Sequence, residues 1–218
     1  MSQSARVALK SVVWTACLLP LLMLLHKFWA DDLGANPISY ATNVLGETTL
    51  RILLASLALT PLRLLFGISW QMSLRRLLGL FAFFYAVLHF TVWVVVDQFF
   101  NWAGMLADIR KRPYITVGML ALTLLVPLAL TSTTRMVKRL GGLNWRRLHR
   151  LVYVASVAAI LHFSWLAKKG RTDPYLYATI LAALLGVRGW HWAARALGKR
   201  RMVALGAPSP QKRVAGAP

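Results

Sequence analysis

The sequence has few acidic residues and almost no cysteine. Of its 218 residues only six are Asp or Glu, and the single cysteine, Cys17, lies inside an apolar run. One thiol can form neither an intrachain disulfide nor a cysteine-rich metal or redox motif, so cysteine chemistry is excluded. A glycine-rich dinucleotide-binding loop is also lacking.

Basic residues, in contrast, are abundant. The 26 Lys and Arg give a formal net charge of +20, which in a soluble protein would suggest nucleic-acid binding. Here 58% of the residues are hydrophobic, the mean hydropathy is +0.57, and the charges lie between long apolar runs rather than on one face of a helix. We therefore expect no nucleic-acid binding and a protein of the lipid bilayer whose basic loops flank its spans.

Six segments are long and apolar enough to cross a membrane, because a helix of about 20 residues covers roughly 30 Å of hydrocarbon. The sequence predicts an all-α integral membrane protein in which residues 1–198 form a six-helix bundle. Residues 199–218 are predicted to form a basic, disordered tail. Pro61 and Pro127 are expected to kink the second and fourth helices, which a bundle tolerates when neighbours bond the freed carbonyl. The predicted spans cover about residues 12–29, 49–66, 77–96, 114–131, 149–166 and 175–192.

The distribution of charge predicts the orientation of these spans. If the N-terminus is inside, 18 of the 26 basic residues fall on the inner side and all six acidic residues fall on the outer side. Loops rich in Lys and Arg stay in the cytoplasm, so both termini are predicted to be cytoplasmic.

Two histidines lie deep inside the predicted spans, and an ionisable side chain at that depth is costly enough to indicate function. His89 and His162 belong to the third and fifth spans, which both run outward, so they are expected to lie level in the outer half. No carboxylate or cysteine lies at that depth to complete a zinc or iron–carboxylate site, whereas two facing imidazoles suit the axial positions of a haem iron. The alternative is that each histidine only hydrogen-bonds a serine or a backbone carbonyl of another helix.

His149 lies at the cytoplasmic mouth of the fifth span. The thirteen residues from His149 to His162 correspond to about 20 Å along a helix, the right order for two cofactors stacked one per leaflet. The two side chains would diverge by about 140°, so both face the interior only if the helix is distorted or His149 hangs from a frayed first turn. His149 is therefore considered both as a second ligand and as an interfacial residue.

The third span offers no histidine level with His149, but Arg75 lies fourteen residues before His89, within about 40° of the same helix face. Arg75 is interpreted either as a topology-setting charge or as the partner of a haem propionate or flavin phosphate. His26, His191 and Trp145 are interpreted as interfacial residues.

Three stretches resemble the MsrQ (YedZ) family of bacterial inner-membrane proteins, within the ferric-reductase-like transmembrane superfamily. They are SLRRLLGLFAFFYAVLHF, KRPYITVGMLALTLLVPLALTST and LNWRRLHRLVYVASVAAILHFSW, and the resemblance extends from Arg51 to Trp192. It implies a membrane subunit with one or two haems b, ligated by His89, His149 and His162, and leaves FMN open as a further cofactor. Arg75 matches an arginine that stands where larger oxidases of the superfamily carry a fourth histidine.

The resemblance also implies a route for electrons. They would come from the quinone pool or a cytosolic flavin reductase and pass to a periplasmic molybdenum enzyme, an MsrP-like reductase of methionine sulfoxide in envelope proteins. The outer loops show no nucleophile, acid–base pair or molybdenum ligand set, so the sulfoxide chemistry is expected in the partner and no catalytic residue in this chain. The alternatives are a ferric or quinone reductase of the same superfamily and a non-redox transporter or anchor, although the spans offer a transporter no acid near mid-depth.

Overall fold

The computed structural model describes residues 2–67, 70–167 and 172–204, and every regular element within these ranges is helical. The predicted all-α class is confirmed. The elements are α1 (Gln3–Trp29), α2 (Pro37–Phe66), the 3-10 helix η1 (Trp70–Leu74), α3 (Arg75–Thr91), the π-helix η2 (Val92–Asp97), α4 (Trp102–Lys111), α5 (Pro113–Leu130), α6 (Thr134–Leu140), α7 (Gly142–Leu148), α8 (Leu151–Leu166) and α9 (Asp173–Ala204).

Five stretches of the described chain are long and apolar enough to cross a membrane. They are α1, α2, α3 with η2, α5, and α7 with α8, and they contain or closely overlap the first five predicted spans. α9 contains the sixth predicted span but is outside this set, because Arg188 and His191 lower the hydropathy of that span. α9 also continues past residue 192 to Ala204, and residues 205–218 of the predicted tail lie outside the described residues.

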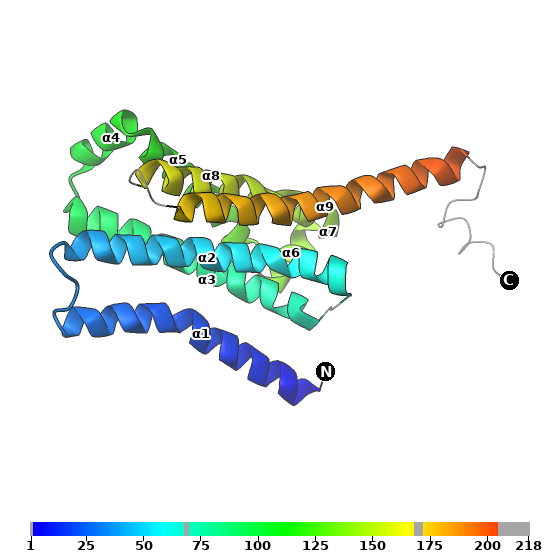
Figure 1. Cartoon of the computed structure of the whole chain (residues 1–218), viewed down its shortest axis with the longest axis horizontal. Helices are drawn as coiled ribbons and strands as arrows, with labels where there is room; N and C mark the ends of the chain where they lie inside the picture. Colours follow the sequence, from blue (N-terminus) through cyan, green and yellow to red (C-terminus); the bar gives the residue numbers. More distant parts are fainter. Residues whose placement is uncertain (1, 68–69, 168–171, 205–218) are drawn as a thin grey trace.

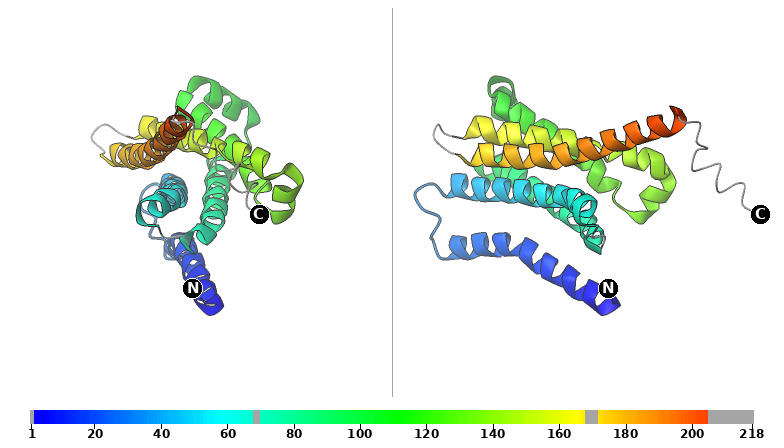
Figure 2. Two further views of the ribbon diagram at one scale, coloured as in Figure 1. Left: turned by 90° about the vertical axis from the view of Figure 1, so that its right-hand side faces the viewer. Right: turned by 45° about the vertical axis from the view of Figure 1, so that its right-hand side comes forward.

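The long helices run alongside one another, with α2 and α3 between α1 and the pair α8 and α9 (Figure 1). The start of α1 and the end of α9 lie at the same end of the bundle as α6 and α7. α4 lies at the opposite end, and the turned views keep this arrangement (Figure 2).

α2 is the central helix, because its side chains enter all three buried clusters of the described core. Leu45 packs with α1 and α3, Leu53 packs with α3, α5 and α8, and Leu57 packs with α8 and α9. Tyr85 of α3 is fully buried and donates its hydroxyl to the Cys17 carbonyl of α1 at 2.6 Å. This bond joins α1 to the bundle at a polar backbone group.

Pro61 lies inside α2, and a half-buried arginine from α9 bonds the carbonyl that this proline leaves free. A proline has no N–H, so the carbonyl four residues earlier, that of Leu57, lacks its helical donor. The guanidinium of Arg188 donates to this Leu57 carbonyl and, at 2.7 Å, to the hydroxyl of Tyr153 in α8. Arg188 therefore ties α9 to α2 and α8 at the point where Pro61 leaves a carbonyl of α2 without its helical donor.

Candidate functional site

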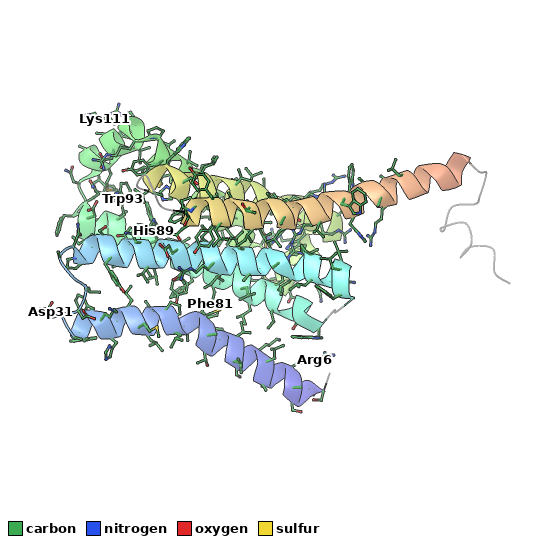
Figure 3. The ribbon with its side chains drawn as sticks, in the orientation of Figure 1. Arg6, Asp31, Phe81, His89, Trp93 and Lys111 are labelled. Carbon is green, nitrogen blue, oxygen red and sulfur yellow. The ribbon has the colours of Figure 1, made fainter. Side chains whose placement is uncertain are left out.

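The structure brings the imidazole rings of His89 in α3 and His162 in α8 together as an edge-to-face pair. Their ring centroids are 6.1 Å apart and their planes are inclined at 83°, which is close to perpendicular. His89 lies near the C-terminal end of α3, on the side of the bundle that holds Trp93 and Lys111 (Figure 3). Two residues that are 73 positions apart in the sequence thus form one polar pair inside an apolar bundle.

Each of the two rings is held by a backbone carbonyl on a neighbouring helix. His89 donates Nδ1–H to the Thr42 carbonyl of α2 at 2.9 Å, and His162 donates Nδ1–H to the Tyr114 carbonyl of α5 at 2.7 Å. A carbonyl can only accept, so the proton of each neutral ring is on Nδ1 and the lone pair is on Nε2. A hydrogen bond from each histidine to a backbone carbonyl was the alternative to metal ligation that the sequence left open. The observed bonds, however, occupy only one nitrogen of each ring. A metal-ligating histidine is commonly oriented in this way by its other nitrogen.

A glycine lies directly behind each ring. A Cβ placed on Gly46 would be 3.1 Å from Nδ1 and Cε1 of His89, and a Cβ placed on Gly118 would be 2.8 Å from Nδ1 of His162. Any side chain at either position would therefore press on the imidazole. Neither glycine stands out as functional in the sequence, where the only signal is the cost of about 1 kcal/mol for a glycine inside a helix.

A cavity of about 270 Å³ adjoins the two histidines. Its walls come from α2, α3, η2, α5 and α8, and they include the small residues Ala86, Ala121 and Ala159. The lining also includes the charged residues Asp97, at the end of η2, and Arg112, which directly follows α4. The site is therefore an apolar chamber with two convergent imidazoles and charged residues in its lining, a combination typical of cofactor sites.

The spacing of the two rings fits a metal bonded by both. Two imidazole–metal bonds of about 2 Å each, with roughly 1 Å from each nitrogen to its ring centre, place the ring centres about 6 Å apart. The observed 6.1 Å agrees with this requirement. No group of three or more His, Cys, Asp or Glu side chains that could hold a metal occurs in the described chain, so a ligand set of two imidazoles points to a metal whose other ligands come from a macrocycle.

A second cavity, of about 480 Å³, lies nearer the end of the bundle that holds α6 and α7. Arg75 and His149 both line it, together with Arg76, Ser132 and Trp145. The structure therefore brings Arg75 and His149 to one cavity and His89 and His162 to the other.

His149 lies in the turn between α7 and α8, since α8 begins only at Leu151. This position resolves the expected angular conflict with His162, because His149 is not part of the straight helix. Its ring stacks on Trp145 with centroids 4.0 Å apart, and its Nε2 lies 3.1 Å from the Thr131 hydroxyl. Trp145 donates Nε1–H to the Thr131 carbonyl at 2.9 Å.

These contacts give Trp145 a role in supporting His149, in addition to its interpretation as an interfacial residue. Thr131, the partner of both side chains, carries no signal in the sequence alone. His26 and His191, interpreted as interfacial, line neither of these two cavities.

Comparison with known proteins identifies close relatives. A family model described as a ferric reductase like transmembrane component matches residues 45–160. A protein of Rhodospirillum rubrum is 54% identical over 81% of this chain and 85% of its own length. Proteins of Ralstonia nicotianae and Herminiimonas arsenicoxydans are 48% and 51% identical, each over 86% of this chain and 87% of the relative. All three are named protein-methionine-sulfoxide reductase heme-binding subunit MsrQ.

Proposed function

The chain belongs to the MsrQ family, within the ferric-reductase-like transmembrane proteins, and from this premise we propose that it is the haem-binding electron-transfer subunit of a methionine sulfoxide reductase. The observation that carries the proposal is the pair of imidazoles, His89 and His162, with ring centroids 6.1 Å apart beside an apolar cavity. The geometry supports a role for these residues that the family name alone does not specify.

His89 and His162 are the proposed axial ligands of an outer haem b. Both rings present Nε2 as the free lone pair, because both Nδ1–H groups are used by the carbonyls of Thr42 and Tyr114. When bound, the haem iron supplies the one-electron chemistry. The protein supplies two ligands already oriented and a water-poor path between α2, α3, α5 and α8.

The second cavity is the proposed inner site. His149 would act as a ligand there, and Arg75 would pair with an anionic group, either a haem propionate or the phosphate of FMN. A quinone could also occupy this cavity, because its lining includes the basic residues Arg75 and Arg76 and the aromatic residue Trp145. The proposed protein therefore binds one haem at the outer site. Its inner site binds a second haem, an FMN or a quinone.

The proposed topology has six spans within residues 1–198, and both termini lie in the cytoplasm. Its support is that α1 begins and α9 ends at the same end of the bundle as α6 and α7, where basic residues are concentrated (Figure 1). The 32 residues of α9 are long enough to cross a bilayer, although its middle is less apolar than the other spans. The proposed location is the bacterial inner membrane.

Electrons would enter from the quinone pool or a cytosolic flavin reductase and leave toward a periplasmic, MsrP-like molybdenum enzyme. The polar lining near Asp97 and Arg112 marks the proposed exit, because it opens the outer cavity toward the end that holds α4. Methionine sulfoxide would be reduced in the partner and not in this chain.

The experiment is a spectrum of the purified chain before and after dithionite. We expect the b-type haem bound per chain to fall by the outer haem in His89→Ala and in His162→Ala, and to stay unchanged in His26→Ala and His191→Ala, the matched histidine controls. An unchanged amount of haem per chain in both ligand variants would refute the ligand assignment. A wild-type chain without haem would refute the redox function and favour a non-redox membrane role.

A second measurement distinguishes between the two possible electron acceptors. The reduced chain is mixed with a periplasmic methionine sulfoxide reductase of the molybdenum type or with a ferric chelate, and haem reoxidation is followed. Fast reoxidation by the molybdoenzyme is expected. Fast reoxidation by the chelate alone would favour a ferric reductase, the function that the family model's description suggests.

A further inference from the structure

The two histidines are held by the same three-part arrangement, repeated on two helix pairs. In α2 the carbonyl of Thr42 lies four residues before Gly46, and His89 of α3 bonds that carbonyl. In α5 the carbonyl of Tyr114 lies four residues before Gly118, and His162 of α8 bonds it. The histidine follows its glycine by 43 residues in one half and by 44 in the other.

The four-residue spacing has a physical reason. In an α-helix the carbonyl of residue i already accepts the N–H of residue i+4, which here is the glycine, so the histidine must use the second lone pair of the same oxygen. The Cα–Cβ bond of residue i+4 tilts toward the helix N-terminus and would cover this side of the carbonyl. A glycine at i+4 is therefore what opens the carbonyl to a ring from another helix.

The distances show how little room each ring has. Ordinary contact requires about 3.5 Å between non-bonded heavy atoms. An alanine at Gly46, whose Cβ would lie at 3.1 Å, has to push His89 away by about 0.4 Å, and one at Gly118, at 2.8 Å, has to push His162 by about 0.7 Å. Displacements of that size take both Nδ1–H bonds beyond the usual limit of about 3.2 Å.

We propose that Gly46 and Gly118 are positioning residues that fix the planes of the two imidazoles near perpendicular, and so set the electronic state and potential of the haem between them. The 83° between the ring planes follows from seating one ring on α2 and the other on α5. Perpendicular axial imidazoles leave two iron d orbitals nearly equal in energy, which gives a highly anisotropic low-spin EPR signal. The part of this inference that concerns the haem rests on the proposed function, whereas the part that concerns the geometry of the two rings does not.

The first measurement needs no haem. The ¹⁵N NMR shifts of histidine in the haem-free chain distinguish a ring with Nδ1–H from one with Nε2–H. In Gly46→Ala we expect the Nδ1–H signature of His89 to be lost and that of His162 to remain, and in Gly118→Ala the reverse. Gly186→Ala is the matched control, because a Cβ there meets nothing within 4 Å and both signatures should remain.

The second measurement is EPR and redox titration of the haem-loaded chain. We expect less anisotropy and a shifted potential in both alanine variants, with the larger change in Gly118→Ala, and no change in Gly186→Ala. If Gly118→Ala does not fold, Gly46→Ala decides the question, because it demands the smaller displacement. Unchanged histidine shifts in a folded Gly46→Ala variant, or equal changes at both histidines, would overturn the proposal. A chain that binds no haem would overturn the proposed function instead, while the NMR comparison would still decide the role of the glycines.

Discussion

Replacing Arg188 with methionine tests whether this arginine compensates for the proline in α2. The variant loses the donors to the Leu57 carbonyl and to the Tyr153 hydroxyl. A buried carbonyl left without a donor costs about 1–3 kcal/mol, whereas measured hydrogen bonds between transmembrane helices average about 0.6 kcal/mol. Removing a cation from apolar surroundings raises the free energy of unfolding. The single variant therefore does not isolate the cost of the unpaired carbonyl.

A double-mutant cycle with Pro61→Ala removes that ambiguity. Alanine at position 61 restores a helical N–H donor to Leu57, so in this background Arg188→Met no longer leaves the carbonyl unpaired. The loss of charge is the same in both backgrounds and cancels in the cycle. We expect Arg188→Met to cost about 1 kcal/mol more in the wild-type background than with Pro61→Ala.

The assay is reversible unfolding in mixed micelles of mild detergent and SDS, followed by far-UV circular dichroism. Arg195→Met is the matched control, because Arg195 is an exposed arginine of the same helix and should show no coupling with position 61. If Arg188→Met lowers the free energy of unfolding equally in the two backgrounds, the arginine does not compensate for the proline.

Three further variants test contacts at helix interfaces. Tyr85→Phe removes the donor to the Cys17 carbonyl and should lower the free energy of unfolding by about 1 kcal/mol with an unchanged haem spectrum, measured in the same micelles. Trp145→Phe keeps an aromatic ring against His149 but loses the Nε1–H donor, so cofactor bound per chain should fall at the inner site only. Thr131→Val frees Nε2 of His149 and should raise inner-site occupancy in a cofactor titration, and unchanged occupancy would contradict that role for Thr131.

The helices and the two outer histidines could be predicted because their signals are local. A run of about 20 apolar residues is a direct requirement of the bilayer, and an ionisable group inside it is costly enough to stand out. The positions of His89 and His162 within their spans predict similar depth, and the structure has the two rings 6.1 Å apart.

The residues that hold the histidines could not be predicted, because their role depends on how helices rotate against each other. The sequence contains 14 glycines, and nothing local separates Gly46 and Gly118 from Gly186, beside which the structure shows open space. Trp145 belongs to a residue type that is common at membrane interfaces, so its sequence position suggests no other role. Only the turn between α7 and α8 brings His149 against its ring.

The two cavities differ in how far they are prepared for a cofactor. At the outer site both ligating nitrogens are already free, since backbone carbonyls occupy only the opposite nitrogens of His89 and His162. At the inner site His149 is the only histidine that lines the cavity of the described chain, and the Thr131 hydroxyl holds its Nε2. Two oriented imidazoles lower the cost of binding a haem, whereas a single imidazole leaves the second ligand to be supplied by another group. The outer site is therefore expected to bind its haem more tightly, and the inner site to accept several occupants with lower affinity.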